Sequence, residues 1–332
     1  MDHPQSVIQK KVTLSTIVNF VTIYLPIILV LVITAFLRLW DLHEIPPGLY
    51  HDEAINANQA REAWRPPSGG FKIFYPENNG REGLFINIQA LSLAAFGNTL
   101  FAVRFPSALF GIFTVLGIFF LTKKLFESDR VALFASFFLA TSFWHINFSR
   151  IGFRAIMAPF FLVWSFYFLW RLINSFLQNN VIASDPADAR ERGNPVEIAS
   201  FSDRDRSPRN DTLRYTFYAA IGGLFFGLGF HSYIAYRVAP LLLIVPFFAS
   251  WKIYKSTLSS LSFVRYFDIS TFRMRSNCLP CLLALFLFFA FIAALPLGMY
   301  FLENPADFVG RSSQISIFSS ETPLEDLGKN IL

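Results

Sequence analysis

The stretch from Val103 to Thr122, VRFPSALFGIFTVLGIFFLT, decides the fold, because it is apolar on every side and long enough to cross a bilayer. A hydrocarbon core needs about 20 residues of helix, whereas a surface helix of a soluble protein keeps one polar face. Six further stretches have the same character, at residues 17–37, 131–148, 155–173, 215–232, 235–252 and 279–300. They predict an all-α integral membrane protein, a polytopic helical bundle with about seven transmembrane helices.

The composition agrees with this prediction. Of the 332 residues, 54% are hydrophobic and only 15% are charged, whereas soluble domains carry about 25% charged residues. The net charge of +5 comes from basic residues scattered between the apolar stretches. Membrane topology explains such a distribution better than a nucleic-acid surface does. We therefore expect membrane lipids, and no nucleic acid, among the partners.

The loops give an orientation. Lysines precede the first stretch, which has no small-residue cleavage site, so residues 1–16 are predicted to be a cytoplasmic N-terminus before a retained anchor. In the transmembrane domain, residues 17–300, the loop 38–102 then lies outside and the mixed-charge loop 174–214 lies in the cytoplasm. Residues 301–332 begin a second large outside loop. We expect the chain to be a truncated form of a longer protein.

Two adjacent acids stand out in the first outside loop, Asp52 and Glu53 in PPGLYHDEAINANQ. An Ala-rich helix is predicted to begin here, so one interpretation is that Asp52 caps that helix. A second helix, starting at Leu84 in LFINIQALSLAAFG, is too short to cross and is predicted to be interfacial or re-entrant. Asp52 can also be a general base, and the two roles are compatible.

Arginines favour the second role. Arg150, Arg154 and Arg237 lie in short outside turns that contain no acidic residue. Each alone can be a snorkelling side chain, but together they are typical of an anion site, because guanidinium groups bind phosphate oxygens bidentately. Arg81, between Gly80 and Gly83, is a fourth candidate, unless it pairs with Glu77 or Glu82. The predicted substrate-binding residues around them are His51, His231, Tyr233 and Tyr236, with His145 nearby.

An acid pair beside arginines at the membrane surface suggests group transfer from a lipid-linked phosphate. The carboxylate would take a proton from the acceptor while the arginines stabilise the leaving phosphate. No resident cofactor is expected, although His51 or His231 with a carboxylate leaves a divalent metal open. No metal-ligating residues are assigned. Cys278 and Cys281 are interpreted as packing thiols.

In these residues the chain resembles the GT-C superfamily of membrane glycosyltransferases, in the bacterial branch related to protein O-mannosyltransferases and to the aminoarabinose transferase that modifies lipid A. The resembling segments, in order, are FLRLWDL, PPGLYHDEA, GREGLFINIQALSLAAFG, AVRFPSALFGIFTVLGIFFLTKKLF, SRIGFRAIMAPFFL, YIAYRVAPLLL and YFLENPADFVGRSSQISIF. They cover nearly the whole chain, although such enzymes usually have more membrane spans.

The resemblance implies a polyprenyl-phosphate-linked sugar donor, an acceptor that is a protein, lipid or glycan, and inverting transfer on the outer face of a bacterial cytoplasmic membrane. Asp52 matches the catalytic aspartate of the family and Glu53 its neighbour. Arg81 falls where relatives carry a lysine near the donor phosphate, but Glu82 and Gly83 replace two prolines usual there.

Two other functions are alternatives to sugar transfer. A transporter or lipid-phosphate-binding protein could use the same arginines without chemistry, although transporters place charges near the midplane on broken, repeated helices. Here the charges are predicted at one surface and no inverted repeat is visible. A structural subunit that keeps the fold without catalysis is the third interpretation.

Overall fold

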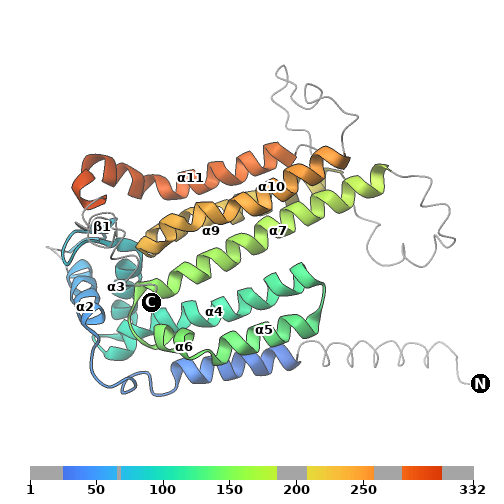
Figure 1. Ribbon diagram of the computed structural model, residues 1–332. Helices are drawn as coiled ribbons and strands as arrows, with labels where there is room; N and C mark the ends of the chain where they lie inside the picture. Colours follow the sequence, from blue (N-terminus) through green and yellow to red (C-terminus); the bar gives the residue numbers. More distant parts are fainter. Residues whose placement is uncertain (1–24, 66–68, 185–207, 258–278, 309–332) are drawn as a thin grey trace, which may run out of the picture.

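The computed structural model describes residues 25–65, 69–184, 208–257 and 279–308, and these are mostly helical, as predicted (Figure 1). A bundle of long helices runs through the molecule, and a smaller group of short elements covers one end of it. The helices of the bundle are Leu25–Leu39, α4 (Leu100–Phe126), α5 (Asp129–Thr141), the shorter α6 (Phe143–Arg150), α7 (Met157–Ser184), α9 (Pro208–Leu228), α10 (Ala239–Thr257) and α11 (Leu279–Glu303).

Three helical segments in the described part of the chain are long and apolar enough to cross a membrane, namely Leu100–Phe126, Arg154–Phe176 and Leu279–Glu303. A fourth is the pair α5 and α6, if the two count as one span. The structure thus supports three or four spans where the sequence predicted seven. Of the first stretch, 17–37, the structure describes residues 25–37. The sequence at the start of α9 is polar, since it contains Arg209, Asp211 and Arg214.

The expected span at residues 131–148 is not one straight helix. It breaks at Ser142, and α5 and α6 meet at an angle of 57°. The guanidinium group of Arg38, fully buried, lies at the break and donates to the carbonyls of Leu139 (3.3 Å) and Ala140 (3.0 Å) and to Nδ1 of His145 (2.7 Å). A break exposes carbonyls that an intact helix would bond internally, so Arg38 supplies the donors that are missing.

The core is made largely of aromatic side chains. The helix α7 packs on α9 and α4, and α9 packs on α11. Glycines bring α9 and α11 close together, because an added Cβ would lie 2.2 Å from the carbonyl oxygen of Phe286 at Gly223 and 2.2 Å from that of Ala290 at Gly227. This four-residue glycine spacing is a common contact of membrane helices.

The short elements that cover one end are α2 (His51–Trp64), β1 (Phe74–Tyr75), β2 (Arg81–Glu82) and α3 (Gly83–Phe96), at the left of Figure 1. The two strands are antiparallel, with Phe74 opposite Glu82. Both helices predicted in this segment are therefore present. We call α2, β1, β2 and α3 the cap.

Several boundaries and one chemical state differ from expectation. The predicted loop 174–214 is partly helical, because α7 continues to Ser184 and α9 begins at Pro208. Cys281 is disulfide-bonded, so its interpretation as a packing thiol is wrong. Four of the predicted features lie outside the described residues. They are residues 1–16, the centre of the predicted cytoplasmic loop, Cys278 and most of 301–332.

Candidate active site

Three segments distant in sequence meet at the cap. They are the N-terminal turn of α2, the turn after α6 with η1 (Arg154–Ile156), and the connection between α9 and α10, which contains η2 (Gly229–His231) and η3 (Ile234–Val238). The backbone N–H of Gly152 donates to Glu53, Arg154 pairs with Glu82, and Arg154 lies over the ring of Tyr233. The turns that the sequence assigned to one surface are thus at one end of the bundle.

Glu53 is the centre of this meeting point. Its side chain is fully buried, and Oε1 accepts from Arg104 Nε at 2.8 Å and from the Gly152 N–H at 3.0 Å. The other oxygen, Oε2, accepts from Arg104 Nη2 at 3.4 Å and from the Tyr50 N–H at 3.2 Å. One carboxylate therefore joins α2, α4 and the turn after α6.

Arg104 extends the same set of contacts into the first loop. Its guanidinium group, also fully buried, donates to the carbonyls of Leu42 (3.2 Å) and Gly48 (2.6 Å). A buried charge is tolerated when it is paired and its remaining hydrogen-bonding positions are filled. Arg104 and Glu53 meet both conditions, so this pair fixes the direction in which α2 leaves the bundle.

The position of Gly152 has no room for a side chain. A Cβ there would lie 2.8 Å from Nε2 of Gln89, 2.9 Å from Cγ1 of Val103 and 3.1 Å from Cγ of Glu53. Only a residue without a side chain lets the backbone N–H approach the carboxylate of Glu53 so closely.

Asp52 precedes this buried carboxylate but lies in a different environment. Its side chain is 25% exposed, and Oδ1 accepts from Asn78 Nδ2 at the long distance of 3.4 Å, with Nδ1 of the exposed His51 at 3.9 Å. The N-cap of α2 is Tyr50, and the carboxylate that bonds the cap N–H is that of Glu53. The interpretation of Asp52 as the N-cap residue is therefore wrong, because Asp52 follows the N-cap, Tyr50, by two residues.

Arg81 begins β2, directly after the loop whose Asn78 contacts Asp52. The loop turns through left-handed residues Asn78, Asn79 and Gly80, with φ of 51°, 65° and 78°. Arg81 is 1% exposed, and its Nη1 donates to Asn56 Oδ1 at 2.7 Å. Asn56, on α2, in turn donates to the Gly152 carbonyl at 3.1 Å. Arg81 is therefore held against α2 on the buried side of the loop.

Arg154 has an acidic partner that its own turn does not contain. It is fully buried, and its Nε lies 3.3 Å from Oε2 of the buried Glu82. The carbon of its guanidinium group is 5.3 Å from the centre of the Tyr233 ring. The inference that Arg154 lacks a carboxylate partner is thus corrected, since Glu82 comes from the cap and lies 72 residues away in sequence.

Arg150 holds the backbone of the first loop. It is 8% exposed and donates to the carbonyls of Leu37 (2.9 Å), Trp40 (2.7 Å), Asp41 (3.3 Å) and Ile45 (2.9 Å). These contacts satisfy the two terminal nitrogens of the guanidinium group, whereas its buried Nε has no hydrogen-bond partner among the described residues.

Arg237 is the most accessible of the four arginines, since its side chain is partly exposed. It donates to the Phe308 carbonyl at 3.1 Å and lies over the rings of Phe301 (5.1 Å) and Phe308 (4.6 Å). Of the aromatic candidates beside it, Tyr236 is 2% exposed and packs against Phe226 and Phe230. His231 bonds the Ala293 carbonyl at 2.9 Å through Nε2.

Sequence reasoning missed the buried polar residues that build this end of the molecule, above all Arg38, Arg104, Asn56 and Glu82. All four are 3% exposed or less. A signal was available for Arg104, which is the one charged residue within the apolar stretch 103–122. Charged residues in membrane segments usually have a partner. In the described ranges, no group of three or more His, Cys, Asp or Glu residues is placed to hold a metal ion.

The fold and the site together define a multi-pass helical membrane protein whose polar residues gather at one end of the bundle. Residues 84–180 match the family of dolichyl-phosphate-mannose-protein mannosyltransferases. The match confirms the resemblance to the GT-C superfamily of membrane glycosyltransferases. It runs from α3 into α7 and includes Arg150 and Arg154, whereas Asp52 precedes it and Arg237 follows it. No curated protein and no solved structure matches the chain significantly.

Proposed function

We propose that this protein transfers a sugar from a polyprenyl-phosphate-linked donor to an acceptor, with Asp52 as the general base. The match to a mannosyltransferase family supports the reaction class. The acceptor is a protein, lipid or glycan that reaches the cap from the outer face of a bacterial cytoplasmic membrane.

One contrast between neighbouring side chains carries the assignment of the base. Glu53 is fully buried and bonded through both oxygens, whereas Asp52 is 25% exposed and has, among the described residues, only the long contacts with Asn78 at 3.4 Å and His51 at 3.9 Å. A general base needs a free lone pair within reach of the acceptor proton. Asp52 meets this condition and Glu53 does not, so we assign Glu53 a positioning role for the first turn of α2.

The candidate arginines also differ in how far their guanidinium groups are already bonded within the protein. Arg150 and Arg154 are occupied by backbone carbonyls and by Glu82. Arg237 is partly exposed and lies next to two aromatic rings, so it is the best placed to meet the donor phosphate. Arg81, at the start of β2, is the second candidate, although it is 1% exposed and bonded to Asn56.

The reaction is a single displacement. The acceptor oxygen forms a bond to the anomeric carbon of the sugar as the bond from that carbon to the phosphate oxygen breaks. The acceptor proton passes to Asp52, and polyprenyl phosphate leaves with the electron pair, stabilised by Arg237. One displacement inverts the anomeric configuration, whereas retention would need a second, nucleophilic group.

The test is release of polyprenyl phosphate from a radiolabelled lipid-linked sugar by the purified full chain in lipid nanodiscs. Loss of general-base catalysis lowers rates by about 100-fold or more, so we expect that loss in Asp52→Asn. The control is Glu62→Gln, which removes an exposed carboxylate from the same helix. Full activity in Asp52→Asn would refute the assignment.

A further inference from the structure

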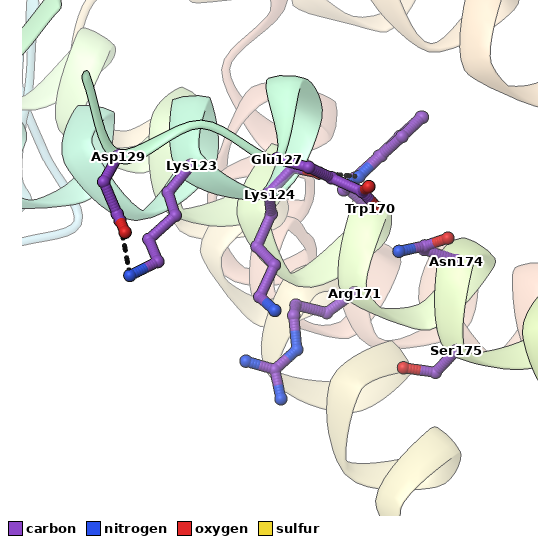
Figure 2. A pocket seen from close by; sticks show the side chains of 8 residues that line it. All are labelled: Lys123, Lys124, Glu127, Asp129, Trp170, Arg171, Asn174 and Ser175. Carbon is purple, nitrogen blue, oxygen red and sulfur yellow. Dashed lines mark hydrogen bonds and ion pairs between the residues drawn. The ribbon is translucent and has the colours of Figure 1, made fainter. Parts of the chain in front are cut away.

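A polar pocket lies where α4 ends, α5 begins and α7 passes by (Figure 2), and its volume is about 290 Å³. In Figure 1 these parts of the helices lie at the end of the bundle opposite the cap. The lining residues are Lys123, Lys124, Glu127, Asp129, Trp170, Arg171, Asn174 and Ser175. An α-helix rises about 1.5 Å per residue, so Lys124 lies roughly 30 Å along α4 from Arg104.

Two of the three cations in this pocket form no ion pair with a carboxylate of the described residues. Lys123 is paired with Asp129, with Nζ 2.6 Å from Oδ1. Lys124 has no such pair, although Glu127 also lines the pocket, and Arg171 donates to the neutral phenol oxygens of Tyr167 and Tyr218. Figure 2 shows Lys124 and Arg171 projecting to the same side of the pocket, while Lys123 points towards Asp129.

The guanidinium group of Arg171 is held in place by two tyrosines. Nη1 donates to the hydroxyl of Tyr167 at 2.8 Å, and Nη2 donates to the hydroxyl of Tyr218. The same group lies 5.7 Å and 4.8 Å from the centres of these two rings. Contacts with neutral aromatic groups orient the cation without cancelling its charge.

The wall of the pocket adds neutral hydrogen-bonding groups. Asn174 and Ser175 follow Arg171 by three and four residues on α7, so the three share one face of the helix. Nε1 of Trp170 donates to the Lys124 carbonyl at 2.9 Å, which fixes the end of α4 against α7. A fixed fork, an ammonium group, an amide and a hydroxyl are groups that bind phosphate oxygens.

A simpler account exists for the lysines alone. Lys123 and Lys124 lie in the last turn of α4, where cations complement the helix dipole. That account does not explain why Arg171, on a different helix, is oriented towards the same space with neutral partners only. The convergence of cations from two helices indicates a ligand.

We propose that this pocket binds a phosphate group, and that the phosphate is carried by the headgroup of an anionic membrane lipid. Leu125 and Phe126, next to Lys124, are 42% and 64% exposed, so apolar surface that suits acyl chains adjoins the pocket. A basic pocket between transmembrane helices at the membrane surface is well suited to such headgroups. This site is separate from the proposed transfer site at the cap.

The experiment measures retention of lipid by the full chain. Native mass spectrometry after addition of phosphatidic acid, with phosphatidylcholine as the neutral reference, counts the bound lipids. Losing a charge-assisted hydrogen bond lowers affinity about tenfold, and we expect that loss of phosphatidic acid in Lys124→Gln and in Arg171→Gln. Arg130→Gln, an exposed position that does not line the pocket, should retain the lipid like the unchanged protein.

A competition arm with inorganic pyrophosphate separates the two sources of phosphate. Retention of phosphatidic acid in the presence of pyrophosphate supports the headgroup. Displacement that depends on Lys124 supports a phosphate site that takes a soluble ligand, and overturns the lipid assignment. If Lys124→Gln and Arg171→Gln bind phosphatidic acid as well as the unchanged protein does, and likewise bind pyrophosphate as well as it does, the proposed site is wrong. Transferase activity is read separately, so failure here leaves the cap assignment unaffected.

Discussion

Glu53 and Arg104 form a fully buried ion pair, with 2.8 Å between Oε1 and Nε, although 51 residues separate them in sequence. The pair joins α2 to α4 at the base of the cap. Asp52 directly precedes Glu53 on α2. The position of Asp52, the proposed base, therefore depends on the ion pair between Glu53 and Arg104, although Asp52 is not part of that pair.

Replacement of Glu53 by Gln should therefore destabilise the protein. Breaking a buried pair leaves the other charge uncompensated, which costs about 3–5 kcal/mol. The measurement is the free energy of unfolding in a denaturing-detergent titration, with Glu62→Gln as the exposed control on α2. A Glu53→Gln protein of unchanged stability that has lost transfer would instead make Glu53 a catalytic residue.

Gly152→Ala should disturb the same place without a change of charge. The added methyl group would lie within 2.8 Å of Gln89 and 3.1 Å of Glu53, and overpacking of this kind costs about 1–3 kcal/mol. The matched control is Gly70→Ala, where nothing lies within 4 Å of the added carbon. Equal unfolding free energies for the two variants would contradict the close approach of Gly152 to Glu53.

Arg150→Ala should act on stability more than on donor binding. The substitution removes donors from the carbonyls of Leu37, Trp40 and Ile45, and charge-assisted hydrogen bonds contribute about 1.5–3 kcal/mol each. We expect a clear loss of unfolding free energy, with donor affinity of the folded protein within about twofold of the original. If Arg150→Ala instead lowered the affinity for the lipid-linked sugar and left the free energy of unfolding unchanged, Arg150 would be a residue of the phosphate site.

Arg237→Gln should give the opposite pattern. Its side chain is partly exposed and bonds one described carbonyl, that of Phe308, so we expect a smaller loss of stability than in Arg150→Ala, whereas the donor phosphate would lose a charged partner. We expect donor affinity, measured as the Kd for the lipid-linked sugar, to weaken about tenfold. Arg61→Gln provides the comparison, because Arg61 is also partly exposed and lies on α2, where it bonds Asn98. Unchanged Kd in Arg237→Gln would remove this arginine from the proposed mechanism.

Much of the helical architecture follows from the sequence. Apolar length located the long helices, and the short helices at Asp52 and Leu84 are present as expected. The break at Ser142 could not be predicted, because its carbonyls are satisfied by Arg38 from another helix. Hydrophobicity reports length and position along the chain, but it does not report which distant side chain completes a hydrogen bond.

The candidate site shows the same limit. Charge counting within short turns left Arg154 without an acidic partner, yet Glu82 reaches it from the cap. Partners brought together over 72 residues, as these two are, leave no local pattern in the chain. The N-cap of α2 is a different case, because its bond is local: the Tyr50 N–H bonds Glu53, three residues later, and not Asp52.

Arg38 has a consequence for biosynthesis. Its guanidinium group donates to the Thr34 carbonyl of its own helix, but its other carbonyl acceptors, Leu139 and Ala140, follow it by 101 and 102 residues. A guanidinium group in hydrocarbon is costly unless its donors are satisfied. We therefore expect Arg38 to reach its complete set of acceptors only after α5 and α6 have been made, so the C-terminal end of its helix can pack in its final position only after them.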